Sequence, residues 1–159
     1  MMKNHSMQMS QGSNYLPLLI MTAVSFIYMY FFMYAMIDGL PHFYNNINQI
    51  YMAGLMAAPM AIVELVIMRS MYSNRRMNLI VIVMAALATI AFWFLIREQA
   101  AVGDRQFLRS MIPHHASAIL MCDQATISDQ RIQNLCKEIV DGQKREIAEM
   151  ESILAGPLN

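Results

Sequence analysis

Three long apolar runs constrain what this chain can fold into. Residues 15–37 carry no charged side chain, residues 47–68 carry one, Glu64, and residues 77–96 again carry none. An α-helix rises about 1.5 Å per residue, so about 20 apolar residues cross the hydrocarbon core of a bilayer. We therefore predict three transmembrane helices that form a membrane domain over residues 15–96. The first run is too long for the apolar region of a cleaved signal peptide, and no small-x-small cleavage site follows it closely.

The composition agrees with a membrane protein and narrows the range of partners. Charged residues make up 14% of the chain and hydrophobic ones 57%, whereas about 25% charged residues is typical of soluble domains. The formal net charge is zero, and without a basic run there is no reason to expect a nucleic-acid partner. The expected surroundings of the chain are a lipid bilayer.

The arginines of the connecting loops predict the orientation. Arg69, Arg75 and Arg76 lie between the second and third runs, while no arginine or lysine lies between the first and second. The positive-inside rule places the arginine-rich loop in the cytoplasm. The N-terminus is then cytoplasmic, and everything after Ile96 lies outside, which is the periplasm if the membrane is a bacterial inner membrane.

The N-terminal tail, residues 1–14, is polar and is expected to be disordered. His5, Met7 and Met9 alternate within it, and this spacing could also chelate a soft cation.

The segment 97–159 differs sharply from the runs before it, because it holds sixteen of the 22 formal charges. Gly103-Asp104 predicts a helix stop and an N-cap. We expect one helix over about 105–125, kinked near Pro113, a turn over 126–129, and a second helix over about 130–154. So small a hairpin cannot bury enough apolar surface to fold alone. The predicted fold is therefore all-α, with three transmembrane helices followed by a hairpin that completes a four-helix bundle by homo-oligomerisation.

Residues 111–122 concentrate metal-binding donor types on the first helix of this hairpin. At 3.6 residues per turn, Met111, His114, His115, Met121 and Cys122 fall on one broad face. Imidazole, thioether and thiolate select soft or borderline metals, with Cu(I) first among them. The simpler alternative is an apolar packing stripe in which one histidine is a satisfied polar neighbour.

The expected register of the hairpin adds residues from the second helix. A turn near 128–129 places Cys122 opposite Cys136, His115 opposite Gln143, and Met111 opposite Ile147, one turn from Glu146 and Met150. A carboxylate among apolar side chains is costly unless it is compensated. A metal ion, or a hydrogen bond from a ligating histidine, removes that cost. The register therefore favours a metal site between the two helices.

The same residues resemble a known family. The pattern Asp104-x-x-Phe107-x-x-x-Met111-Ile-x-His114-His115-x-x-Ala118-x-x-Met121, followed by Gln143-x-x-Glu146-Ile147-x-x-Met150, is similar over residues 100–155 to the ferritin-like domain of unknown function 305. That family includes periplasmic copper-binding proteins of the CopM type, and a form anchored by three spans looks like a known arrangement in it. The resemblance implies a helical bundle that binds copper or silver and contributes to metal tolerance. Carried over by position, it implies soft ligands at Met111, His114, His115, Met121 and Met150, and polar or supporting members at Asp104 and Glu146.

Cys122 and Cys136 lie outside that pattern, and three interpretations of them stay open. They could form a disulfide across the hairpin, which an oxidising periplasm would favour. They could add a Cu(I) thiolate pair to the metal site. They could also be two buried and inert thiols.

The spans carry a methionine pattern of their own. Methionines can fill apolar gaps and pack against aromatic rings. A bolder hypothesis is a thioether path that carries Cu(I) across the bilayer, because an ionisable residue such as Glu64 inside a span points to function. The residues of this pattern are Met52, Met56, Met60, Glu64 and Met68 in the second run, and Met29, Met33 and Met36 in the first run, near Asp38 and His42.

The function we expect is that of an inner-membrane-anchored copper-binding protein without enzymatic activity, active in copper homeostasis and tolerance. It would sequester Cu(I), or Ag(I), or exchange it with a copper chaperone or efflux partner, while Cu(II) and Zn are alternative metals. A Zn site or a purely structural membrane oligomer is a competing hypothesis, the Zn ligands being His114, His115, Cys122 and Cys136. A ferritin-like redox enzyme is disfavoured, because Glu146 is followed at the third position by Glu149 rather than His.

Overall fold

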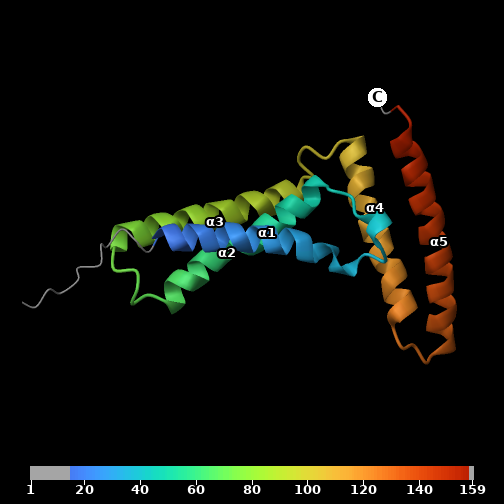
Figure 1. The fold of residues 1–159 in the computed structure, drawn as a ribbon, viewed down its shortest axis with the longest axis horizontal. Coiled ribbons are helices and arrows are strands. Elements are labelled where there is room, and N and C mark those ends of the chain that lie inside the picture. Colours follow the sequence, from blue (N-terminus) through green and yellow to red (C-terminus); the bar gives the residue numbers. More distant parts are fainter. Residues whose placement is uncertain (1–14, 158–159) are drawn as a thin grey trace, which may run out of the picture. The chain divides into compact units, whose positions relative to one another are not determined.

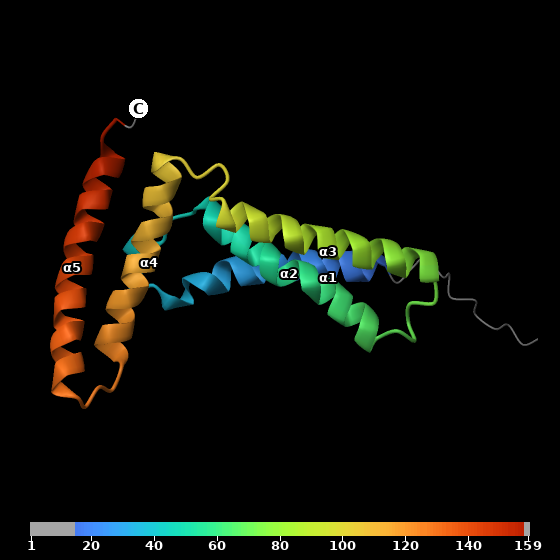
Figure 2. The same cartoon turned by 180° about the vertical axis from the view of Figure 1, so that it is seen from behind.

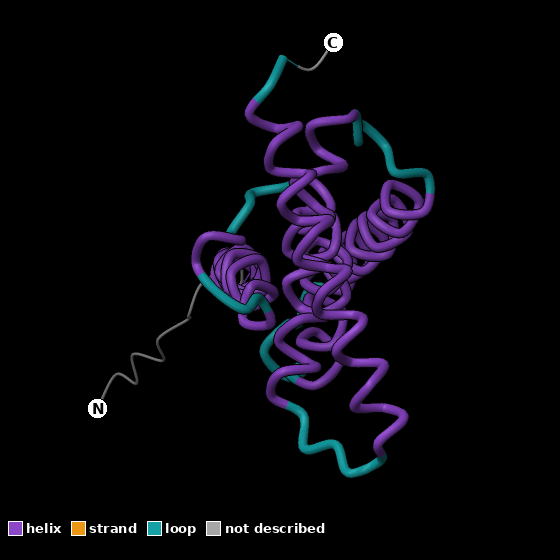
Figure 3. The backbone as a smooth tube through the Cα atoms, turned by 90° about the vertical axis from the view of Figure 1, so that its right-hand side faces the viewer, coloured by secondary structure: helices purple, strands orange, loops and turns teal. Residues whose placement is uncertain are grey.

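The computed structural model describes residues 15–157, and this part of the chain is helical without a strand (Figure 3). The predicted all-α class is thereby confirmed for the described residues. The predictions for residues 1–14, including those for His5, Met7 and Met9, lie outside this range and stay predictions. The elements in chain order are α1 (Tyr15–Phe32), the 3-10 turns η1 (Met33–Met36) and η2 (Leu40–His42), α2 (Ile47–Ile67), α3 (Arg75–Arg97), α4 (Asp104–Gln124) and α5 (Gln130–Ala155).

Three helices are long and apolar enough to cross a membrane. They are Tyr15–Met36, which joins α1 and η1, then Ile47–Ile67 and Arg75–Arg97. Their bounds lie close to the predicted runs 15–37, 47–68 and 77–96. By length and composition, the coarse expectation of three membrane-crossing helices therefore holds for the described part of the chain.

The chain divides into two compact units, which we name the span unit and the hairpin unit. The described residues of the span unit are 15–29 and 53–94, and those of the hairpin unit are 30–52 and 95–157. The hairpin unit therefore contains the end of the first candidate span and the beginning of the second, in addition to the segment that begins at residue 97.

Small residues allow close packing inside the span unit. Gly54, Ala57 and Ala61 of α2 are buried, and a Cβ atom added at Gly54 would collide with the ring of Phe92 on α3. Without the Cβ, the aromatic ring approaches the α2 backbone directly. This is the packing role that small residues have in membrane helices.

The ionisable residue of α2 has a partner in the loop that follows it. The Tyr72 hydroxyl donates a hydrogen bond of 2.7 Å to Oε1 of Glu64, while Oε2 is buried without a hydrogen-bond partner among the described residues. Burial raises the pKa of the Tyr72 hydroxyl to about 12, and the hydrogen bond to Glu64 and the charge of Glu64 act in the same direction. Met56 and Met60 on the same helix are exposed, as expected of side chains that face lipid.

In the hairpin unit, α4 and α5 run antiparallel side by side (Figures 1 and 2). Asp129 is the N-cap of α5, and its side chain accepts from the Arg131 amide at 2.8 Å. Hydrogen bonds from Arg131 hold the pKa of the Asp129 carboxyl below its usual value. The core between the helices consists of Leu108, Ile112, Ala116, Ile119, Ile147 and Met150.

Both predicted hairpin helices are found within one residue of their expected bounds, and α4 continues through Pro113. One local expectation is wrong. The N-cap of α4 is Gly103, and Asp104 is the first helical residue, with no side-chain hydrogen bond from the cap.

The segment before α2 also covers the hairpin core. The turns η1 and η2 both contact α4, and Ile37 and Tyr44 pack against the core. The Tyr44 hydroxyl donates to Oε1 of Glu151 on α5 at 3.2 Å. The hairpin therefore gains apolar partners from an earlier segment of its own chain. These contacts were not predicted from the sequence.

Four hydrogen bonds position the start of α2 within the same unit. Asn46 is 2% exposed and its Oδ1 accepts from the Gln49 amide, as an N-cap does. The remaining three bonds tie the first turn and a half of α2 to α4 and to the turn before it: Ile47 N to Gln106 Oε1 (3.1 Å), Asn48 Nδ2 to Gln99 Oε1 (3.0 Å) and the Tyr51 hydroxyl to the Ala100 carbonyl (2.8 Å).

Candidate functional site

His115 is the centre of the polar contacts between α4 and α5. The side chain is largely buried, its Nδ1 lies 2.9 Å from the Met111 carbonyl, and its Nε2 lies 2.7 Å from Oε2 of Glu146. Carbonyl and carboxylate oxygens are acceptors, so Nδ1 donates and a proton must lie between Nε2 and Oε2. The two contacts together fix the orientation of the ring.

Two thioethers adjoin this pair. A pocket of about 280 Å³ is lined by Met111, His115, Glu146 and Met150, together with Phe107, Glu149 and Ile153. We call it the His115 pocket. Four of the residues singled out in the sequence therefore meet as the register of the hairpin predicted, although His115 faces Glu146 rather than Gln143.

His114 lies in a different pocket. Its ring is exposed, its centroid is 6.1 Å from that of His115, and it has no hydrogen-bond partner among residues 15–157. It lines a pocket of about 330 Å³ that Met111 also borders, which we call the His114 pocket. The adjacent histidines therefore do not share one site, and Met111 is the residue common to both.

Two further predicted ligands do not join either pocket. Met121 is 58% exposed on α4, and Asp104 is exposed at the first position of that helix. Neither lines the His115 pocket nor the His114 pocket. Helical periodicity placed Met121 on the broad face of the helix, and Asp104 was implied only by the family resemblance. The two pockets take residues from the middle of α4.

Cys122 and Cys136 form a disulfide with their Cα atoms 5.4 Å apart. Of the three interpretations left open, the structure selects this one, and a disulfide offers no thiolate to a metal. The expectation that these cysteines are soft ligands is therefore corrected. The Zn site that combined them with His114 and His115 is also excluded in this state, because the two histidines line different pockets.

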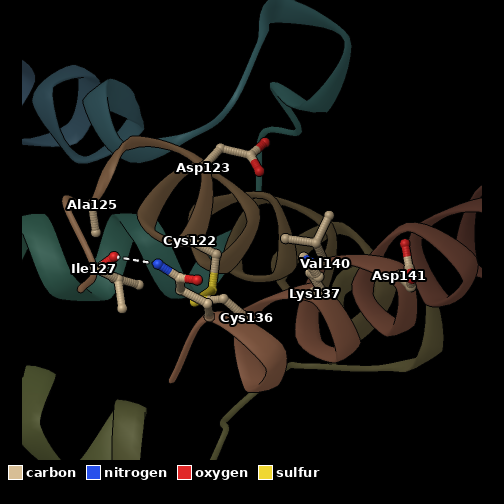
Figure 4. Close-up of a pocket in the computed structure, with 9 residues that line it drawn as sticks. Cys122, Asp123, Ala125, Ile127, Cys136, Lys137, Val140 and Asp141 are labelled. Carbon is tan, nitrogen blue, oxygen red and sulfur yellow. Dashed lines mark hydrogen bonds between the residues drawn. A yellow bond between two sulfur atoms is a disulfide. The ribbon is translucent and has the colours of Figure 1, made fainter. Parts of the chain in front are cut away.

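A further hollow of the hairpin unit lies beside this disulfide, with a volume of about 450 Å³. Figure 4 shows Cys122 and Cys136 among the residues that line it. Gln133, which also lines it, donates a hydrogen bond of 2.8 Å to the Ile127 carbonyl. Its charged residues are Asp123, Lys137 and Asp141. With a lysine and without thioether or imidazole, this hollow is no soft-metal site.

Within the described range no group of three or more His, Cys, Asp or Glu side chains is placed to hold a metal ion. Such groups form zinc and non-haem iron sites. The other soft donors at the two pockets are the thioethers of methionine. Met33, Met36 and Met52 line the His114 pocket. From the sequence, these residues were predicted only as members of the methionine pattern of the spans.

The fold and the pockets define a class: an all-helical chain with three helices suited to a membrane and a disulfide-closed hairpin that carries methionine and histidine. The family model described as a domain of unknown function (DUF305) matches residues 67–154, more than half of the chain, and the chain belongs to that family. The matched range takes in α3 as well as the hairpin.

The sequence is also similar to the uncharacterized protein L153 of Acanthamoeba polyphaga mimivirus. The two are 34% identical over 111 residues, which are 69% of this chain and 71% of the viral protein. No solved structure matches the chain significantly.

The disulfide closes a loop between residues 14 positions apart. Loops of this size contribute about 3 kcal/mol by restricting the unfolded chain. We expect Cys122→Ser/Cys136→Ser to lower the free energy of unfolding of the hairpin by about that amount, as measured by chemical denaturation without reductant. A variant that is as stable as the wild type would contradict this expectation.

Proposed function

We propose that this chain is a membrane-anchored protein that binds Cu(I), or its analogue Ag(I), through Met111, His115 and Met150, with Glu146 as the supporting carboxylate. The observation that supports this is the single pocket lined by all four residues, with His115 held between the Met111 carbonyl and Glu146.

The hydrogen bonds of His115 suit it to be a ligand. Because Nδ1 donates to a backbone carbonyl, Nε2 is the nitrogen whose lone pair a metal ion would take, as in many metal-binding histidines. The ion would displace the proton between Nε2 and Oε2 of Glu146. The carboxylate, then without that proton, would compensate the positive charge of the bound ion.

The donor set favours a soft monovalent ion. Thioethers are soft ligands that select Cu(I), whereas Ca²⁺ and Mg²⁺ require several oxygen ligands and structural Zn²⁺ sites use four His or Cys ligands. The His115 pocket offers two thioethers and one imidazole. A protein with such a site would sequester the ion or pass it to a copper chaperone or an efflux partner, and so contribute to copper homeostasis and tolerance.

The site predicts how two conservative variants behave. Met150→Leu keeps the volume of the core residue but removes a thioether, and Glu146→Gln keeps the shape but removes the charge. We expect Glu146→Gln to weaken Ag(I) binding about 10- to 100-fold and Met150→Leu to weaken it at least as much, as measured by titration of the full chain in detergent without reductant.

The matched control is Met56→Leu, which changes an exposed methionine of α2 and should bind Ag(I) as the wild type does. If Met150→Leu and Glu146→Gln both bind with wild-type affinity, the proposed site is wrong.

The proposed location is a bacterial inner membrane, with the N-terminus in the cytoplasm and the hairpin in the periplasm. The arginines of the loop between α2 and α3 support this orientation. The disulfide supports it independently, because disulfides form and persist in oxidising compartments.

We further propose that two or more copies associate through the hairpins into a helical bundle. Large apolar side chains remain exposed on α4 and α5 even with the segment 30–52 packed against the core. They are Phe107, Met121, Ile132, Leu135 and Ile153, each more than 40% exposed. A second copy that covers them would complete a four-helix arrangement.

This association predicts a concentration-dependent homo-oligomer. Ile132→Glu/Leu135→Glu places charges on the exposed apolar face and should shift the full chain toward the monomer, as measured by light scattering in detergent, whereas Lys144→Glu, also exposed, should not. A wild-type chain that is monomeric at all concentrations with an intact hairpin would contradict the proposal.

A further inference from the structure

We propose that the His114 pocket is a second binding site for a soft monovalent cation, distinct from the His115 pocket. Its ligands would be Met33, Met36 and Met52 from the ends of two candidate spans, with Met111 and His114 from α4. The inference extends the proposed function, since Met111 borders both pockets, but it rests on other residues and can fail separately.

Soft donors dominate this pocket. Four thioethers and one imidazole line a space of about 330 Å³, and they come from three separate segments, η1, α2 and α4. A methionine stripe on one helix is ordinarily packing. Here the methionines of different helices face one hollow together with a histidine, which is the arrangement that thioether ligation requires.

His114 is free to act as a ligand. His115 uses both ring nitrogens in hydrogen bonds, whereas His114 has no hydrogen-bond partner among the described residues and its ring is exposed. A metal ion can therefore take a ring nitrogen of His114 without breaking an existing contact.

A polar atom at the same place lacks a partner. Asn48 lines the pocket, and its Oδ1 is buried and accepts no hydrogen bond from residues 15–157, although its Nδ2 donates to Gln99. The hydroxyls of Ser110 and Ser117, which also line the pocket, donate to backbone carbonyls of α4. A bound cation would compensate the amide oxygen that the protein itself leaves unpaired.

The charge of the pocket selects the valence of the ion. The lining residues include no Asp, Glu, Lys or Arg, so every donor is neutral. A divalent ion would be left uncompensated in such surroundings, and hard cations also lack the carboxylates that they require. A monovalent soft ion, Cu(I) or Ag(I), fits the donor set, and binding without charge compensation is readily reversible.

The walls of the pocket are held by specific hydrogen bonds. Gln106 of α4 accepts from the Ile47 amide at the start of α2, and Tyr51 donates to the Ala100 carbonyl in the turn before α4. These bonds hold the segment that carries Met52 against the helix that carries Met111 and His114. The segments that carry Met52, Met111 and His114 are therefore held together without a bound ion.

The shared methionine gives the second site a role. An ion bound to Met111 in the His114 pocket can exchange Met33, Met36, Met52 and His114 for His115 and Met150 while keeping its bond to Met111. No electron is transferred in this ligand exchange, and the proton between His115 and Glu146 is released. The His114 pocket would be the point where ions enter from the membrane ends of the spans.

The test is the Ag(I) stoichiometry of the full chain in detergent, measured without reductant so that the disulfide stays intact. Relative to the wild type, Met33→Leu/Met36→Leu/Met52→Leu should bind one Ag(I) fewer, and so should His114→Ala, which alters an exposed side chain and leaves the core untouched. The control Met56→Leu/Met60→Leu/Met68→Leu removes three exposed methionines that lie in α2 or directly after it. This control should keep the wild-type number of bound Ag(I) ions.

If the triple variant and His114→Ala both keep the wild-type number, the second site is overturned, while loss of one ion in Met150→Leu would still support the His115 pocket. If the triple variant and His114→Ala each lose one ion and Met150→Leu loses none, the second site stands and the proposed function of the His115 pocket fails.

Discussion

The hydrogen bond between His115 Nε2 and Glu146 Oε2, at 2.7 Å, is the contact on which the rest of the hairpin site depends. It crosses from α4 to α5, and its partner bond from Nδ1 to the Met111 carbonyl fixes the ring on its own helix. With the Cys122–Cys136 disulfide at the turn end of the hairpin and the apolar core between the helices, it joins α4 to α5 in one register. That register places Met150 beside Met111 in one pocket. The same bond decides the chemistry, because a metal ion can reach Nε2 only by replacing a proton.

Met111 connects this pocket to a second one with a different character. The His115 pocket contains a carboxylate and is bordered by both hairpin helices, while the His114 pocket is neutral and is bordered by the ends of two candidate spans. A charged site holds a cation more tightly than a neutral one of the same soft donors. If both proposed sites bind the ion, the neutral pocket would exchange it readily and the pocket with the carboxylate would retain it.

Much of the fold could be predicted from the sequence, because its signals are local. Charge-free runs mark the candidate spans, and the cap residue Asp129 and apolar periodicity mark the hairpin helices to within one residue. The cross-hairpin meeting of His115 and Met111 with Glu146 and Met150 followed from the turn position.

The predictions that failed depended on three-dimensional context. Helical periodicity could not tell that His114 and His115 face different pockets, or that Met121 and Asp104 stay outside both. Met52 is held near α4 by hydrogen bonds such as that from Ile47 to Gln106, and η1, which carries Met33 and Met36, contacts α4. No spacing along the chain reveals such contacts. The family match supports the hairpin pattern and extends it through α3, but by its description it adds no function.

We propose that thioether sulfur and imidazole nitrogen together bind a soft monovalent ion in the His115 pocket. The most direct measurement is the silver X-ray absorption spectrum of the full wild-type chain loaded with Ag(I) without reductant, compared with that of Met150→Leu. The account predicts sulfur and nitrogen neighbours in the same first shell, with a smaller sulfur contribution in the variant. A first shell of nitrogen and oxygen alone, or a spectrum that Met150→Leu leaves unchanged, would contradict it.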